Sequence, residues 1–110
     1  MIEPQSVPDL LSSFNALPFE PFRDGVEIHH IRKGAPAVAL LRYAPGAQVP
    51  HHRHTGLETI LVLEGEQSDE RGTYQTGSYV MNPEGTSHSV WSKTGCVVLI
   101  QWERPVEFVD

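Results

Sequence analysis

From Val26 to Trp102 the chain alternates short β-prone runs with breaks that contain glycine or proline, and this alternation restricts the fold more than any other feature. The candidate strands between the breaks are Val26–Ile31, Ala37–Tyr43, Thr59–Leu63, Glu66–Asp69, Ser78–Met81, Ser87–Trp91 and Val97–Trp102. Many short strands at a spacing of about ten residues, separated by turn signals, are typical of a sandwich or barrel. No window after residue 24 shows a sustained helical period. The sequence therefore predicts an all-β fold.

The first 24 residues have a different character. They carry Pro4, Pro8, Pro18 and Pro21, and proline removes a backbone donor and fixes φ. We therefore expect a mostly extended, irregular N-terminal arm over residues 1–24, with one helical turn near Asp9–Phe14, packed on the body or on a partner subunit. Residues 25–110 are predicted to form one barrel domain, because a chain of 110 residues is of single-domain length.

Composition excludes several function classes. The formal net charge is −6 and the eight lysines and arginines are scattered, whereas a nucleic-acid-binding surface clusters basic charge. No run approaches the roughly 20 apolar residues of a membrane helix, and the N-terminus lacks a secretory pattern. Cys96 is the single cysteine, so an intramolecular disulfide is excluded, and we read Cys96 as a small buried residue. These features predict a cytoplasmic protein with no membrane or direct nucleic-acid partner.

Four residues form a candidate metal site. His52 and His54 are two apart, so on an extended strand both imidazoles point to the same side, and Glu58 has the same parity. His88 follows the turn Pro83–Gly85, which can bring the next strand back opposite the first three residues. Imidazole nitrogens and carboxylate oxygens suit zinc, iron, manganese, nickel or copper. We predict that these four residues bind one divalent metal ion.

The same residues carry a resemblance to cupins. The first cupin motif is matched by Gly46, His52, His54, Glu58 and Gly65, and the second by Gly77, Pro83, Gly85 and His88. Ser92 stands where the second motif usually has asparagine, a position that is not a metal ligand in cupins. The motifs cover residues 46–92, and the strand pattern extends the likeness to about residues 25–104. The resemblance implies a double-stranded β-helix, or jelly-roll, barrel.

A closer resemblance is to the cupin-like domain of ChrR-type anti-sigma factors. The similar stretches are His52–Gly56, Ile60–Gly65, Ser68–Glu70, Asn82–Pro83, Ser87–His88 and Gly95–Cys96. In that family this domain binds zinc, and a separate N-terminal zinc domain holds the sigma factor. Residues 1–24 contain neither histidine nor cysteine. The resemblance therefore implies the metal site without implying inhibition of a sigma factor.

The number of ligands leaves two function classes open. Three histidines and one glutamate fill a tetrahedral zinc site, which favours a structural site or a sensor of a small molecule or oxidant. With iron, manganese or nickel, six-coordination leaves two positions for a substrate, as in a dioxygenase that acts on a small organic molecule. No separate acid–base pair or nucleophile motif is visible, so the first class, with zinc, is favoured. Isomerisation or epimerisation of a sugar ranks lower, because no base is evident.

The run Leu57–Leu63 is apolar on both faces. Alternation places Ile60 and Val62 on the side of Glu58, and Leu61 and Leu63 on the other side. A strand of a small monomeric barrel usually has one solvated face. We therefore predict a homodimer that covers the second face.

The remaining conspicuous residues are given structural roles. We expect His51 to face away from the site, and His29 and His30 to be structural or on the surface. The acidic run Glu64–Glu70 is predicted to be a solvated turn. The large side chains are expected to form barrel core, with lining of a small-molecule pocket as the alternative: Tyr43, Tyr79, Met81, Trp91 and Trp102.

Overall fold

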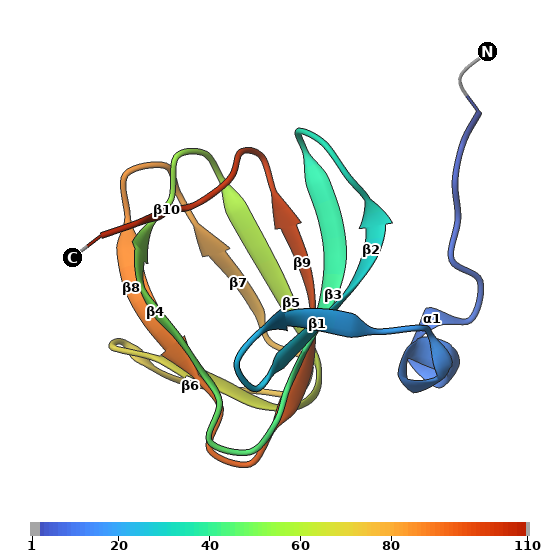
Figure 1. The fold of residues 1–110 in the computed structure, drawn as a ribbon, viewed down its shortest axis with the longest axis horizontal. Coiled ribbons are helices and arrows are strands. Elements are labelled where there is room, and N and C mark those ends of the chain that lie inside the picture. The colour runs from blue at the N-terminus through green and yellow to red at the C-terminus, as the bar shows by residue number, and fades with distance from the viewer. Residues whose placement is uncertain (1–2, 110) are drawn as a thin grey trace.

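The structure is a computed structural model that describes residues 3–109, and it is a curled antiparallel barrel (Figure 1). The elements are α1 (Leu10–Ser13), η1 (Phe14–Ala16), β1 (Glu20–Arg23), β2 (Val26–Arg32), β3 (Ala37–Tyr43), β4 (Gln48–Arg53), β5 (Glu58–Asp69), β6 (Gly72–Gln75), β7 (Tyr79–Asn82), β8 (Ser87–Trp91), β9 (Cys96–Trp102) and β10 (Glu107–Phe108). The strands pair in the order β1-β2-β3-β9-β5-β8-β4-β10, and β6 and β7 also pair with β5. This architecture confirms the all-β barrel that the sequence predicts.

Strand β5 connects the two layers of the barrel. Its first half pairs with β7 and β9, and its second half pairs with β6 and β8. The sequence predicts two separate strands here, but the structure has one strand of 12 residues. The bend lies at Gly65, whose φ of 75° is in the left-handed region that favours glycine. The chain therefore changes direction at Gly65 without leaving the sheet.

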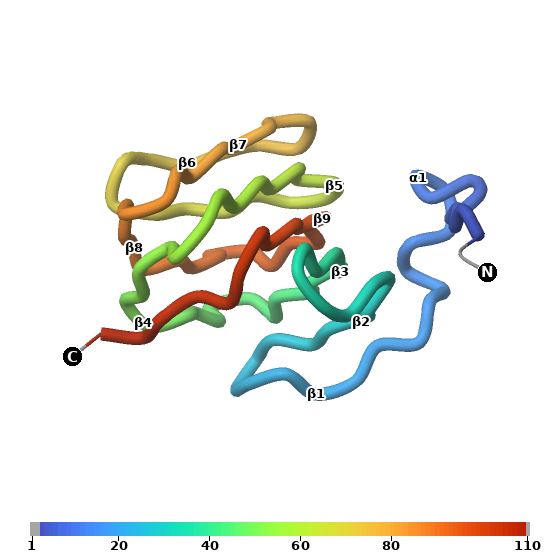
Figure 2. The backbone as a smooth tube through the Cα atoms, turned by 90° about the horizontal axis from the view of Figure 1, so that it is seen from above, coloured from blue at the N-terminus to red at the C-terminus, as the bar shows by residue number. Residues whose placement is uncertain are grey.

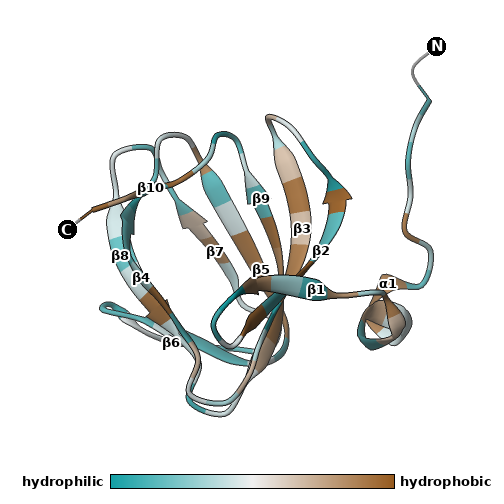
Figure 3. Cartoon of the chain, viewed as in Figure 1, coloured by the Kyte–Doolittle hydropathy of each residue, from teal (hydrophilic) through white to brown (hydrophobic). Residues whose placement is uncertain are grey.

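The core fills the space between the layers. On β5, Ile60 and Val62 are buried, whereas Leu61 and Leu63 on the opposite face are half-buried. Apolar stretches on β3, β5 and β9 supply much of this core, as the brown segments of Figure 3 show. The predicted alternation along β5 is therefore confirmed.

The N-terminal arm covers part of the outer face of the sheet. It runs from β1 along the side of the barrel to α1 (Figure 2). Phe14 is buried against Leu40 and Val97, which belong to the outer faces of β3 and β9. The arm thus packs on the body of its own chain, and its last strand, β1, is hydrogen-bonded to β2. The division of the chain at residue 24 stays a prediction, because β1 joins the arm to the sheet.

Several expectations about the barrel are wrong. Strands β1, β4, β6 and β10 are absent from the predicted set, because they are short, polar or interrupted by proline. Tyr79, Met81 and Trp91 are not core: they are 61%, 59% and 37% exposed. Tyr79 and Met81 pair with Leu61 and Thr59 on the outer face of β5, so their parity directs them outward.

None of the helical segments within residues 3–109 has the length and apolar character needed to cross a bilayer.

Candidate metal centre

Adjacent strands bring the four predicted residues to one end of the barrel. His52 lies on β4 directly opposite His88 on β8. The register of these strands shifts between Val49 and His52, a bulge that changes which side chains face inward. His54 follows the end of β4, and Glu58 begins β5.

The turn Pro83–Gly85 is fixed against His54. The backbone N–H of His54 donates to the carbonyl of Thr86 at 2.8 Å, and the N–H of Gly85 donates to the carbonyl of His54 at 2.8 Å. Gly85 has a φ of 92°, which glycine adopts without strain. This turn returns the chain along β8, so the prediction that His88 lies opposite His52, His54 and Glu58 is confirmed.

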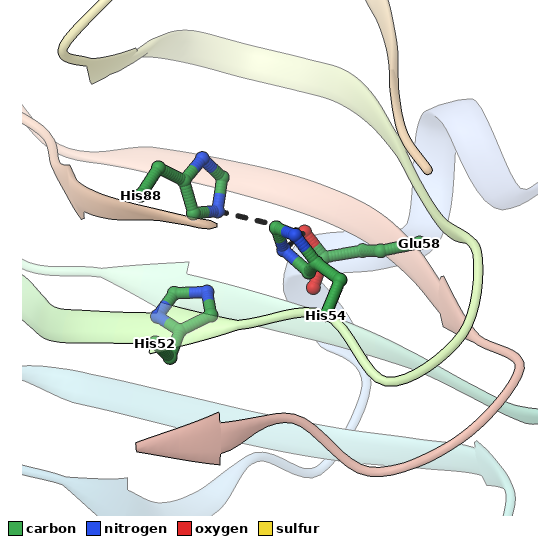
Figure 4. A group of neighbouring side chains, drawn as sticks. All are labelled: His52, His54, Glu58 and His88. Carbon is green, nitrogen blue, oxygen red and sulfur yellow. Dashed lines mark hydrogen bonds and ion pairs between the residues drawn. The ribbon is translucent and has the colours of Figure 1, made fainter. Parts of the chain in front are cut away.

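The four side chains converge, as Figure 4 shows. One possible ligand atom from each of His52, His54, Glu58 and His88 lies within 4.8 Å of the others, and all four residues are buried. The Glu58 Oε1 atom lies 3.1 Å from His54 Nε2 and 3.8 Å from His88 Nε2. This group could hold a metal ion.

Hydrogen bonds fix the tautomers of His52 and His88. His52 Nδ1 lies 2.8 Å from the carbonyl oxygen of Pro50, and His88 Nδ1 lies 3.0 Å from Asp69 Oδ2. A carbonyl and a carboxylate only accept, so both Nδ1 atoms carry the proton and donate. The Nε2 lone pairs of both rings are therefore free to face the centre of the site.

His54 is held in the same way. Its Nδ1 lies 3.0 Å from both the carbonyl and the hydroxyl oxygen of Thr86. The Thr86 hydroxyl donates its own proton to the carbonyl of Pro83 at 2.6 Å, so it accepts from His54. His54 Nδ1 is thus a donor, and its Nε2 points to Glu58.

This arrangement places acceptors against acceptors. With the three Nδ1 protons committed, three Nε2 lone pairs and one carboxylate oxygen share the centre. His88 Nε2 is buried and has no hydrogen-bond partner among the described residues. Buried polar atoms are normally satisfied. A positive charge at the centre, either a shared proton or a metal ion, is what the geometry requires.

Glu58 is fixed from behind by two donors. Asn82 Nδ2 donates to Oε1 at 3.1 Å, and Trp102 Nε1 donates to Oε2 at 2.8 Å. Burial acts to raise the pKa of Glu58. When the charge shared at the centre is a proton on His54 Nε2, its hydrogen bond to Glu58 and the nearby imidazoles outweigh burial and hold the pKa of Glu58 below its usual value. Glu58 is therefore a carboxylate aimed at the three histidines.

Burial lowers the pKa of His52, whereas it acts to raise the pKa of Glu58. The lowered pKa of His52 favours the neutral imidazole, which is the form that binds a metal.

Sequence reasoning missed Asp69 and Asn82. Asp69 belongs to the acidic run predicted to be solvated, but it is only 4% exposed and bonds to His88. That expectation is wrong for Asp69, because the end of β5 points it under the site. Both residues lie within the stretches that resemble ChrR-type domains, which was the available signal.

A small cavity adjoins the site. It measures about 70 Å³ and is lined by His52, Glu58 and largely apolar side chains, with Tyr43 and Gln67 among them. Burial raises the pKa of Tyr43 far above its usual value, so its hydroxyl stays protonated. An apolar groove of about 300 Å³ shares part of the cavity's wall: Phe22, Trp102, Val106 and Phe108.

The other histidines and Cys96 lie away from the centre. His51 is exposed and its Nδ1 lies 3.3 Å from Ser89 Oγ, as expected for a residue that faces away. His29 Nδ1 lies 2.9 Å from the carbonyl of Pro18, and His30 Nε2 lies 3.5 Å from a Glu20 carboxylate oxygen. Cys96 is buried, as predicted, and burial raises the pKa of its thiol to about 11.

Comparison with known proteins agrees with the geometry. The ChrR cupin-like domain family matches residues 7–105. Anti-sigma-E factor ChrR of Cereibacter sphaeroides is 33% identical over 87 aligned residues, and the match covers 76% of this chain and 41% of ChrR. The chain thus spans less than half the length of that relative.

Solved structures give the same fold. A putative acetylacetone dioxygenase from Methylibium petroleiphilum PM1 covers all of this chain with a TM-score of 0.86, over 83% of its own length at 14% identity. The anti-sigma factor ChrR of Rhodobacter sphaeroides, solved in complex with SigE, has a TM-score of 0.71 and 26% identity over 78% of this chain and 48% of its own. The jelly-roll cupin prediction is confirmed, and the chain belongs to the ChrR cupin-like domain family.

Proposed function

We propose that this chain binds one divalent metal ion, preferentially zinc, through His52, His54, Glu58 and His88, and acts as a sensing or regulatory domain. The observation that carries the proposal is the convergence of four buried acceptor atoms, one from each residue. The Nδ1 atoms of the three histidines already donate hydrogen bonds elsewhere, so their Nε2 atoms are left for the ion. Neutral imidazoles and a carboxylate are suitable ligands for zinc. The partnerless Nε2 of His88 fits the same ion.

The orientation of the site suits a small ligand. His52 and Glu58 line the cavity, so a ligand in it would lie beside two of the four residues that would hold the ion. A bound ion would supply positive charge to bind and polarise an oxygen-bearing molecule. The mostly apolar walls would exclude water, and the Tyr43 hydroxyl, which stays protonated, would donate a hydrogen bond to such a ligand. The volume of about 70 Å³ limits the part of the ligand that reaches the metal to a few atoms.

Sensing is favoured over catalysis by the lack of other reactive groups. Apart from His52 and Glu58, the titratable residue that lines the cavity within residues 3–109 is Tyr43, and its pKa is raised by burial. The Cys96 thiol is also held protonated by burial. The name of the relative, anti-sigma-E factor ChrR, supports a regulatory role that acts through a partner protein.

The second candidate is a metal-dependent dioxygenase that acts on a small organic substrate. The cavity beside the site favours it, since it would give a substrate room next to the residues that would hold the metal, and a six-coordinate iron held by four residues would leave two positions for a substrate. The likeness to acetylacetone dioxygenases suggests β-diketones as the first substrates to test.

One experiment separates these functions. The protein is purified without added metal and its metal content is determined by elemental analysis. Three results together support the sensor. The protein holds about one zinc per chain tightly, its melting temperature falls when a chelator is added, and it takes up no oxygen with acetylacetone after anaerobic loading with iron. Oxygen uptake that depends on iron and substrate supports the enzyme. A folded protein whose melting temperature responds to none of these metals contradicts both.

We also propose that the chain is a homodimer. The outer face of β5 and β7 is apolar and incompletely covered by the arm, with Leu61 half-buried and Tyr79 and Met81 well exposed. A second copy placed on this face would remove these side chains from water.

A further inference from the structure

One arginine touches two of the side chains that support the site from outside, Asn82 and Asp69. Arg71 follows β5 in the turn to β6, and its side chain is 54% exposed. Its Nη2 donates to Asn82 Oδ1 at 2.9 Å and lies 3.7 Å from Asp69 Oδ2. Asn82 in turn bonds to Glu58, and Asp69 bonds to His88.

The orientation of Asn82 is dictated by the charges on either side of it. Asn82 is fully buried, and its Nδ2 donates to Glu58 while its Oδ1 accepts from Arg71. A carboxylate only accepts and a guanidinium only donates, so the amide can satisfy both in this orientation alone. Arg71 therefore fixes the group that holds Glu58.

Asp69 depends on the same arginine. It is 4% exposed, and its oxygens lie 3.0 Å from His88 Nδ1, 2.9 Å from the backbone N–H of Arg71 and 3.1 Å from the Tyr74 hydroxyl. A buried carboxylate is costly unless it is paired and hydrogen-bonded. The Arg71 guanidinium supplies the compensating charge while staying in contact with water.

We infer that Arg71 is a positioning residue of the metal site, which sets the orientation and donor strength of Glu58 and His88 together. The inference rests on the proposed metal binding. Two of the four ligands are linked through Asn82 and Asp69 to a single guanidinium, so its loss would loosen both at once. Asn82 and Asp69 bond directly to the proposed ligands, and loss of such direct partners typically changes metal affinity by about 10–100-fold. Arg71 lies one step further out and acts through both of them.

The test compares Arg71→Gln and Arg71→Lys with a matched control, Arg53→Gln. Arg53 is also an exposed arginine, 46% exposed and 3.5 Å from a Glu107 carboxylate oxygen, but its ion pair lies outside the network. Zinc affinity is measured by competition with a chromophoric chelator, the visible spectrum is recorded after loading with cobalt, and the melting temperature of the zinc-free protein is determined.

The expected result is specific to Arg71. Arg71→Gln should weaken zinc binding by about 10-fold, the lower end of the range for direct partners of the ligands, and should change the cobalt spectrum. The zinc-free melting temperature should fall only modestly, because Asp69 loses the nearby charge but keeps its hydrogen bonds to Tyr74 and to the Arg71 backbone. Arg71→Lys, which keeps the charge, should recover part of the affinity, and Arg53→Gln should bind like the wild type. Wild-type affinity and spectrum in Arg71→Gln, or an equal loss in Arg53→Gln, would overturn the role of Arg71 while leaving metal binding intact. A wild-type protein that binds neither zinc nor cobalt would instead overturn the proposed function, and this inference with it.

Discussion

Two neighbouring histidines on β4 point to opposite sides of the sheet, and they provide a direct test of the site. His52 is buried among the candidate ligands, whereas His51 is exposed. A ligand at 100 times its Kd stabilises a fold by about 2.7 kcal/mol, which is roughly 10 °C in melting temperature for a domain of this size. His52→Ala should abolish this zinc-dependent rise in thermal melts, and His88→Ala should do the same. His51→Ala should retain it, and an equal loss in His51→Ala would argue against the assigned ligands.

Glu66 gives a pH dependence that is separate from the metal site. Burial acts to raise its pKa, but donated hydrogen bonds from the Thr94 N–H, the Thr94 hydroxyl and the Ser68 hydroxyl outweigh it and hold the pKa below the usual 4.5. A lowered folded-state pKa stabilises the protein above the unfolded value, and this stabilisation is lost as pH falls through the folded value.

The corresponding variant is Glu66→Gln. The free energy of unfolding should fall at pH 7 by less than about 1 kcal/mol, because the group is only partly buried. The gap to the wild type should narrow below pH 4.5. Denaturant titrations of the metal-free protein at several pH values measure this, and a gap that widens in acid would contradict the assignment.

At the scale of elements, the bend of β5 depends on the space at Gly65 as well as on its backbone angle. A Cβ added at Gly65 would lie 2.1 Å from the carbonyl oxygen of Gly95, whereas one added at Gly46 would meet nothing within 4 Å. Both glycines have a positive φ, 75° and 82°. Gly46→Ala should therefore cost only the backbone strain of about 1–2 kcal/mol.

Gly65→Ala should cost more than about 4 kcal/mol, because β5 and the β8–β9 turn would have to separate. Equilibrium unfolding of the two variants measures the difference. Similar losses in both would show that the close approach of Gly65 to Gly95 does not hold the layers together.

At the scale of the whole molecule, the uncovered outer face predicts the oligomeric state. The protein should sediment as a dimer, and Met81→Lys should shift it toward the monomer by placing a charge on that face. Trp91→Lys is the control, because Trp91 is also exposed but lies on β8 in the other layer. Sedimentation velocity distinguishes the outcomes, and a wild-type monomer at high concentration would refute the dimer.

The sequence by itself determined the barrel and the four residues that meet at its end. Strand periodicity and turn residues are local, so the alternation along β5 and the turn Pro83–Gly85 could be recognised from neighbours in the chain. The spacing of His52 and His54 likewise follows from the geometry of one extended segment.

Only the tertiary structure decided what surrounds those residues. The bulge in β4, the outward parity of Tyr79 and Met81, and the burial of Asp69 depend on pairing between strands far apart in sequence. The sequence of an acidic run is the same whether its carboxylates are exposed to water or, like Asp69, buried beside a metal site. The network that joins Arg71 to Glu58 and His88 exists because β5, β7 and β8 are brought together, and long-range packing of this kind leaves no local pattern in the chain.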